Sequence, residues 1–150
     1  MKHKAILDQL RKGLSILGLQ KELERAPDKF EHLFVHKDDE VSAAYVKELL
    51  KLPTSSDAQV QHVVQMLYAF LQNSSKDDLL DFLCFVTGSR SSTSMFVPGS
   101  IGLSIGNTES IFASTCTLEL KLPSSFLTYS QFESAMTAVL NVQGKKYTTV

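Results

Sequence analysis

Two cysteine thiols, Cys84 and Cys116, are the side chains in this chain best suited to covalent chemistry. A thiol near its ordinary pKa is ionised to about a few per cent at neutral pH, so it can act as a nucleophile without a dedicated base. The two cysteines lie far apart in the sequence, without the spacing of a metal knuckle or of a disulfide framework. We therefore expect two reduced thiols, no metal site and no cofactor.

A nearby histidine would point to a cysteine protease, and the sequence places none close to Cys116. The four histidines are His3, His32, His36 and His62, all far upstream. Because the partners of a catalytic cysteine meet in space, this spacing argues only weakly against a papain-like Cys-His pair.

Residues 114–123 predict a strand that carries Cys116 at its entrance. Apolar and polar side chains alternate along it, as in a half-buried strand. The apolar set is Cys116, Leu118, Leu120 and Leu122, and the polar set is Thr117, Glu119 and Lys121. Pro123 lacks the N–H that a ladder requires, so pairing is expected to end there. From this stretch alone, Cys116 is expected to be a packing residue, since cysteine behaves as a small hydrophobe.

Two helices are predicted before this stretch. The first starts at Ser56 or Asp57 and buries an apolar stripe of Val60, Val63, Val64, Leu67, Phe70 and Leu71. The second begins with a capping box of Ser75 and Asp78 and ends at Gly88, where glycine adopts a left-handed cap at low cost. Cys84 lies inside the second helix among large apolar residues, so we expect it in the core, where burial makes a thiol inert.

A further strand and a last helix complete the second half of the chain. Residues 101–105 alternate as a strand and are followed by a turn at Gly106. The glycines at 99, 102 and 106 do not form a phosphate loop, because no Gly-Lys-Ser/Thr ending follows them. The last helix is predicted to open at Thr128 or Ser130, and Gly144 is expected to stop it.

The first third of the chain differs in composition from the rest. Residues 4–25 predict one broken helix or two short ones, and residues 41–50 predict another. Charge of both signs is dense up to residue 50 and sparser afterwards, and residues 52–57 have the Pro, Ser and Asp of a linker. We therefore predict a helical segment over residues 1–52, a hinge at 53–56 and a domain over 57–150.

Charge and hydropathy exclude several classes of partner. The net charge is -1, and basic residues are spread along the chain, which argues against binding to nucleic acid or to an anionic membrane. The N-terminal segment is charged and amphipathic, unlike a signal peptide, and no apolar run approaches the length of a membrane span. The expected location is the cytoplasm, the nucleus or both.

Four short motifs occur in the same order as in one known family. They are Phe85 to Gly88 at the end of a helix, Thr115-Cys116 followed by Leu120, Leu122 and Pro123, Tyr129 with Phe132, and Gln143-Gly144. Over residues 57–150 the chain resembles the C-terminal lobe of HECT-type ubiquitin ligases. Residues 1–52 resemble the last helices of the preceding lobe in divergent members. The resemblance implies an α+β fold, with a small sheet packed against helices and a short helical segment before it.

The resemblance also implies a function and a set of site residues. Cys116 would be the nucleophile that accepts ubiquitin as a thioester from a ubiquitin-conjugating enzyme and passes it to a lysine of a protein substrate. Ser114, Thr115 and Thr117 would flank it, and Tyr147 occupies the place of an aromatic residue that helps transfer. Many members carry Phe-Asn directly after the cysteine, where this chain has Thr117 and Leu118.

Two alternatives stay open from the sequence. The chain could be a catalytically inactive HECT-like module that binds ubiquitin or acts as a scaffold, or a small α+β interaction domain unrelated to ubiquitin. A working site needs Cys116 exposed on a loop or strand end, whereas an inactive one could bury it. Only the last part of the preceding lobe fits in this chain, so the activity of the isolated chain is a separate question from its fold.

Overall fold

The computed structural model describes residues 2–34, 41–90 and 96–147, which form two compact units. The first unit comprises Met1–Asp38 and the second Asp39–Val150. Residues 41–52, which the sequence analysis assigned to the first part, thus belong to the second compact unit. The assignment of these parts to the lobes of a ligase stays a prediction.

The first unit contains three helices, α1 (Lys2–Ile16), α2 (Leu19–Arg25) and α3 (Pro27–Phe34). Gly18 separates the first two with a left-handed φ of 69°, which agrees with the predicted broken helix. Several large apolar side chains of this unit are exposed: Ile6, Leu7, Leu10, Ile16 and Leu17. No helix in the described parts of the chain is long and apolar enough to cross a membrane.

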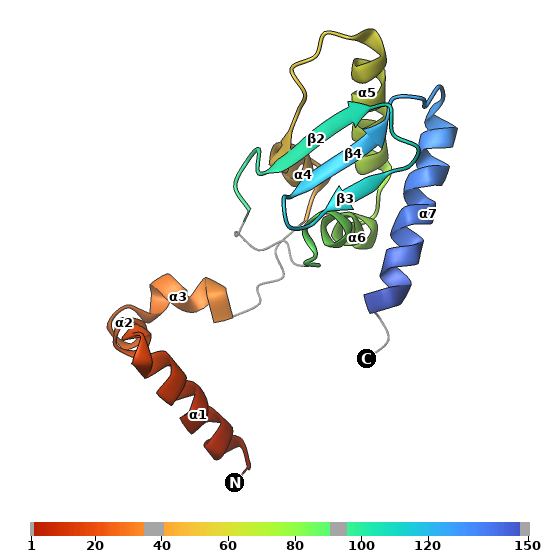
Figure 1. The fold of residues 1–150 in the computed structure, drawn as a ribbon. Helices are drawn as coiled ribbons and strands as arrows, with labels where there is room; N and C mark the ends of the chain where they lie inside the picture. The colour runs from red at the N-terminus through yellow and green to blue at the C-terminus, as the bar shows by residue number, and fades with distance from the viewer. Residues whose placement is uncertain (1, 35–40, 91–95, 148–150) are drawn as a thin grey trace. The chain divides into compact units, whose positions relative to one another are not determined.

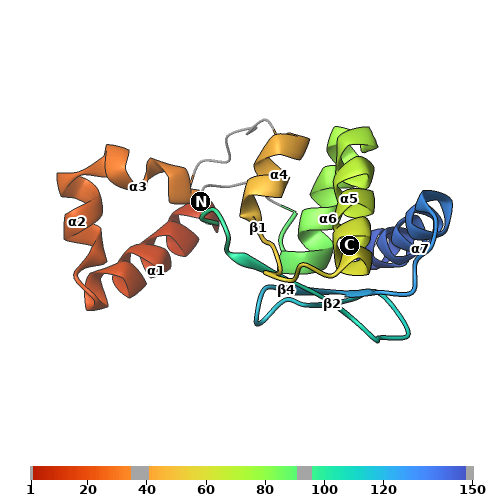
Figure 2. The same cartoon turned by 90° about the horizontal axis from the view of Figure 1, so that it is seen from above.

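The second unit is an α+β layer structure, as predicted. Its strands are β1 (Leu50–Lys51), β2 (Ile101–Gly106), β3 (Phe112–Ser114) and β4 (Glu119–Pro123), in the spatial order β1-β2-β4-β3. The β1-β2 and β2-β4 pairs are parallel, whereas β3 and β4 form an antiparallel hairpin. Figures 1 and 2 show helices α4 (Ala43–Leu49), α5 (Ala58–Asn73) and α6 (Lys76–Thr87) on one side of the sheet. Helix α7 (Tyr129–Tyr147) contacts α5 and α6.

The core forms between this sheet and the helices. Phe82 of α6, Phe132 of α7 and Leu120 of β4 are completely buried. The Phe132 ring meets the rings of Phe70 and Phe126 edge-on, at centroid distances of 6.2 and 5.3 Å. Edge-to-face contacts of this kind add to the free energy gained from burial alone. The apolar stripe predicted for α5 faces this core, since Val63, Val64, Leu67, Phe70 and Leu71 are buried.

Local sequence signals fix where the helices begin and end. The Ser75 hydroxyl accepts from the backbone N–H of Asp78 at 3.2 Å, and the Asp78 carboxylate accepts from the backbone N–H of Ser75 at 3.0 Å. Gly88 ends α6 with φ 77°, and its N–H donates to the carbonyl of Cys84. The predicted capping box and glycine cap are both confirmed. Asp57 caps α5 through the N–H of Gln59.

Two predicted boundaries are wrong. Residues 114–123 do not form one strand, because β3 ends at Ser114, a turn occupies 115–118 and β4 starts at Glu119. Gly144 does not stop the last helix, since α7 continues to Tyr147. A single glycine costs a helix only about 1 kcal/mol, which neighbouring turns can offset. The predicted end of pairing at Pro123 is confirmed.

Truncation tests the extent of the second unit. Helix α4 and β1 bury Val46, Leu49 and Leu50 in the core, each to 6 % exposure or less. Burial of such side chains is worth about 1.5–3 kcal/mol each. A fragment of residues 41–150 is therefore expected to unfold in urea at nearly the same midpoint as the full chain. A fragment of 57–150 should lose at least about 3 kcal/mol, and equal stability of the two fragments would contradict this account.

Candidate functional site

Cys116 lies on the turn that joins β3 to β4. Ser114 and Glu119 form the last pair of the hairpin, so residues 115–118 lie outside the ladder. Thr115, Cys116 and Thr117 are all exposed. The expectation that Cys116 packs on the same face as Leu120 is wrong, since the chain reverses direction between the two residues. The thiol is accessible from solvent.

The turn contains a strained residue, Leu118, with φ 49°. It is the one residue other than glycine with a positive φ in the part of the chain that the structure describes. The left-handed region costs an ordinary L-residue about 1–2 kcal/mol, because Cβ comes too close to a carbonyl oxygen. A backbone bond compensates, since the N–H of Gly102 on β2 donates to the carbonyl of Leu118 at 2.8 Å.

The other end of the turn lies next to the end of helix α6. A Cβ placed on Gly88 would lie 3.6 Å from Cβ and from Cγ2 of Thr115, which is van der Waals distance. Thr87, just before this glycine, donates its hydroxyl to the carbonyl of Leu83 at 2.7 Å and accepts from the N–H of Ser89 at 3.1 Å. Two motifs separated in the sequence, Phe85 to Gly88 and Thr115-Cys116, therefore meet in space.

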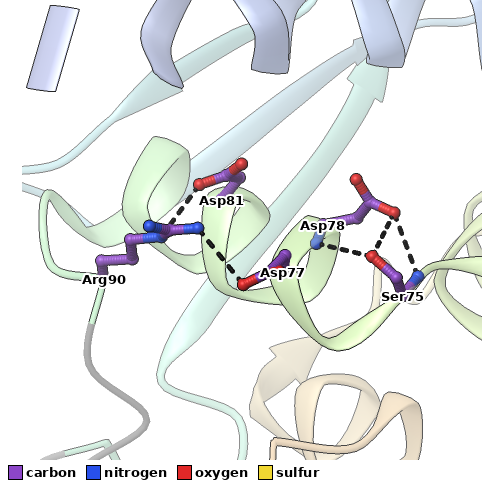
Figure 3. A network of polar contacts seen from close by, with 5 residues as sticks. All are labelled: Ser75, Asp77, Asp78, Asp81 and Arg90. Atoms are coloured by element: carbon purple, nitrogen blue, oxygen red, sulfur yellow. Dashed lines mark hydrogen bonds and ion pairs between the residues drawn. The ribbon is translucent and has the colours of Figure 1, made fainter. Parts of the chain in front are cut away.

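Polar contacts restrain α6 near both ends (Figure 3). The capping box of Ser75 and Asp78 closes its start. After the glycine cap, the guanidinium of Arg90 returns to the helix and pairs with Asp81 at 3.1 Å and with Asp77 at 3.5 Å. These pairs are partly exposed, and each such surface pair contributes at most about 1 kcal/mol. Their effect is to hold the segment after Gly88 against the helix.

Cys84 has a different environment from Cys116. It is half-buried on α6 and not fully in the core as predicted. Burial raises the pKa of the Cys84 thiol, the Asp81 carboxylate raises that pKa further, and Arg90 opposes them. Because the neutral form is favoured, less thiolate is available there at neutral pH. This thiol is poorly suited to nucleophilic chemistry.

An open groove of about 420 Å³ lies beside the turn. Its walls come from the segment after β1, from β2 and from the hairpin, and include Leu52, Pro53, Gly102, Leu103, Thr117 and Glu119. This groove was not predicted from the sequence, in which residues 53–56 have the composition of a hinge between two parts. The parallel pairing of β1 with β2 brings that segment to the hairpin, and no local pattern signals the pairing.

Four of the predicted site residues, 114–117, are consecutive in the sequence and lie at the end of β3 and on the turn. Ser114 ends β3, and Thr115 and Thr117 flank Cys116 on the turn. Tyr147 is the last residue of α7, and its side chain lies outside the part that the structure describes. Whether Tyr147 takes part in the site stays a prediction.

No protein-family model matches the chain. One curated relative, the G2/M phase-specific E3 ubiquitin-protein ligase of Gallus gallus, is 33% identical over 89 residues. The match covers 57% of this chain and 12% of that ligase, so the chain spans a small part of the relative's length. This chain is thus similar to a segment of an E3 ubiquitin-protein ligase.

Alkylation should separate the two thiols. Iodoacetamide at neutral pH is expected to modify Cys116 faster than Cys84 by about tenfold or more, because Cys116 is exposed and Cys84 is half-buried with a raised pKa. Modification of Cys84 should increase as the pH rises toward that pKa, where its thiolate forms. Peptide mass spectrometry over time gives both rates, and equal rates at neutral pH would contradict the two environments.

Substitution of Gly88 tests the cap that supports the turn. Gly88→Ala is expected to lower the free energy of unfolding by about 1–2 kcal/mol, since φ is 77° there and Ala resists that conformation. Gly106→Ala is the matched control, because nothing lies within 4 Å of the added carbon and φ is not positive. In urea unfolding, Gly106→Ala should change the free energy of unfolding by no more than about 0.5 kcal/mol. Equal losses in both variants would show that the left-handed conformation of Gly88 does not contribute to stability.

Proposed function

We propose that this chain acts as a HECT-type ubiquitin-protein ligase segment in which Cys116 accepts ubiquitin as a thioester. The observation that carries the proposal is the exposed Cys116 on a hairpin turn, where the neighbouring Thr115 lies beside Gly88 of the Phe85 to Gly88 motif. The similarity to a segment of an E3 ubiquitin-protein ligase supports the same class of activity. The partners are ubiquitin, a ubiquitin-conjugating enzyme and a protein substrate, in the cytoplasm, the nucleus or both.

The first chemical step is an exchange of one thioester for another. The Cys116 thiolate attacks the carbonyl carbon at the C-terminus of ubiquitin, which is bonded to the sulfur of the conjugating enzyme. The new C–S bond forms, the old one breaks, and the conjugating enzyme's thiolate leaves with the electron pair and is protonated from solvent. The bonds broken and formed are of the same kind, so the step is nearly isoenergetic and needs an accessible thiol above all.

The second step transfers ubiquitin to an amine. The neutral amine of a substrate lysine attacks the thioester carbonyl, an amide bond forms, and the Cys116 thiolate leaves while the amine loses its proton. Holding the two reactants together supplies much of the rate of such a step. The exposed position of Cys116 leaves room for both the donor and the acceptor. Tyr147 is the residue proposed to assist this step.

A discharge assay tests the acceptor role of Cys116. A conjugating enzyme that carries ubiquitin as a thioester is mixed with an excess of this protein. A thiol-sensitive adduct of this protein with ubiquitin is expected on a non-reducing gel. Cys116→Ala should abolish the adduct, and Cys116→Ser should give a thiol-resistant ester or none. Cys84→Ala is the matched control and should leave the adduct unchanged, because its thiol is half-buried with a raised pKa.

The same assay separates an active site from an inactive module. If the chain alone forms no adduct, the complete preceding lobe of a related ligase is added to recruit the conjugating enzyme. An adduct that appears only then, and only with Cys116 present, supports the proposal. Absence of the adduct under both conditions, with ubiquitin binding retained, would favour the HECT-like binding or scaffolding module.

A further inference from the structure

The turn that carries Cys116 is restrained at both of its ends. At one end, Thr115 lies near the glycine cap of α6, where a Cβ added at Gly88 would be 3.6 Å from its side chain. At the other end, the carbonyl of Leu118 accepts from the N–H of Gly102 at 2.8 Å, the bond that starts the β2-β4 ladder at the Gly102-Glu119 pair. A hairpin turn held only by its own strands would have neither contact. The cysteine therefore lies between two points that are tied to other elements.

Leu118 is the residue whose conformation depends on this restraint. Its φ of 49° belongs to a region that Gly and Asn enter readily and that other L-residues avoid. Such strain persists only where the surrounding structure determines the backbone, and it concentrates at functional sites. Here the backbone bond to Gly102 holds the left-handed conformation of Leu118.

The restraint matters because thiol chemistry depends on placement. In an oriented reaction, a displacement of about 1 Å can cost about a hundredfold in rate. Cys116 is two residues before Leu118, so the dihedral angles of Leu118 set the course of the chain between the thiol and β4. A turn that could relax to another shape would leave the thiol exposed but without a fixed direction.

We propose that Leu118 is a positioning residue for Cys116, acting through the left-handed turn that Gly102 and the cap of α6 hold in place. This inference rests on the proposed function, since it concerns how the thiol meets the thioester. Leu118 touches neither reactant and acts through the backbone alone. Its side chain is therefore replaceable by any residue that accepts a positive φ.

The test compares substitutions that accept the left-handed conformation with one that resists it. All are made with Cys84→Ala, so that Cys116 is the remaining cysteine of the two in the chain. Leu118→Asn and Leu118→Gly accept a positive φ, whereas Leu118→Val resists it because Val is β-branched. Leu127→Val is the matched control, since Leu127 is 72% exposed in another loop. Thermal melts establish that each variant is folded at the assay temperature.

The first readout does not depend on ubiquitin. A nitroxide label on Cys116 reports the mobility of the turn by electron paramagnetic resonance. The label is expected to be restrained in the parent and in the Asn, Gly and Leu127→Val variants, and to gain a mobile component in Leu118→Val. If the Val variant does not fold, the Asn and Gly variants alone test the proposal. A mobile label in both of them would contradict the claim that a positive φ at position 118 keeps the turn restrained.

The second readout is the rate of adduct formation, measured against the concentration of charged conjugating enzyme. Leu118→Val is expected to lower the maximal rate about tenfold without changing the half-saturating concentration, and Asn should restore the rate. Asn removes as much apolar contact as Val does or more, so its rescue would point to the backbone. Unchanged rates despite a mobile label would overturn the positioning role. If the parent forms no adduct even with the complete preceding lobe added, the proposed function is refuted. The mobility of the label on Cys116 would still show whether the turn is restrained.

Discussion

The buried face of α6 is the constraint on which the candidate site depends. Phe82, Leu83 and Val86 are completely buried, and burial of three such side chains fixes the helix on the sheet. The position of Gly88 at the end of this helix follows, and Thr115 lies beside it. The exposed thiol is thus located by residues that are themselves remote from solvent. A substitution that loosens the packing of α6 would therefore also displace Cys116, even though no residue of the turn itself is substituted.

The helices could be predicted because their signals are local. The three-four repeat of α5, the Ser75-Asp78 box and the glycine cap all act within one or two turns, and each is seen in the structure. The α+β class was implied by the resemblance to the C-terminal lobe of HECT-type ligases, and the structure has that class. The groove beside the hairpin could not be predicted, because it depends on the parallel pairing of Leu50 with Ile101, two residues that are far apart in the sequence. No local pattern in the sequence indicates that these two segments pair.

The misplaced strand shows how an apolar residue can conceal a turn. The left-handed position of a turn is usually occupied by Gly or Asn, which makes the turn recognisable in the sequence. Many members of the family that this chain resembles carry Asn two residues after the cysteine, and this chain has Leu118 there. The leucine extends the alternation of Leu120 and Leu122 backwards, so the pattern predicted one strand that includes Cys116. In the structure, the carbonyl of Leu118 accepts from the N–H of Gly102 while Leu118 has a left-handed φ and not the extended conformation that the alternation predicts. The pattern of apolar positions does not contain this information.

The two cysteines show why residue type alone does not identify a nucleophile. By sequence, Cys84 and Cys116 both have apolar neighbours at suitable spacing, and both were first expected to pack. The helix places Cys84 beside Asp81 and partly out of water, which favours its neutral thiol. The hairpin places Cys116 in solvent on a restrained turn. The helix therefore gives Cys84 a half-buried thiol with a raised pKa, whereas the reversal of the chain between β3 and β4 leaves the thiol of Cys116 accessible to solvent.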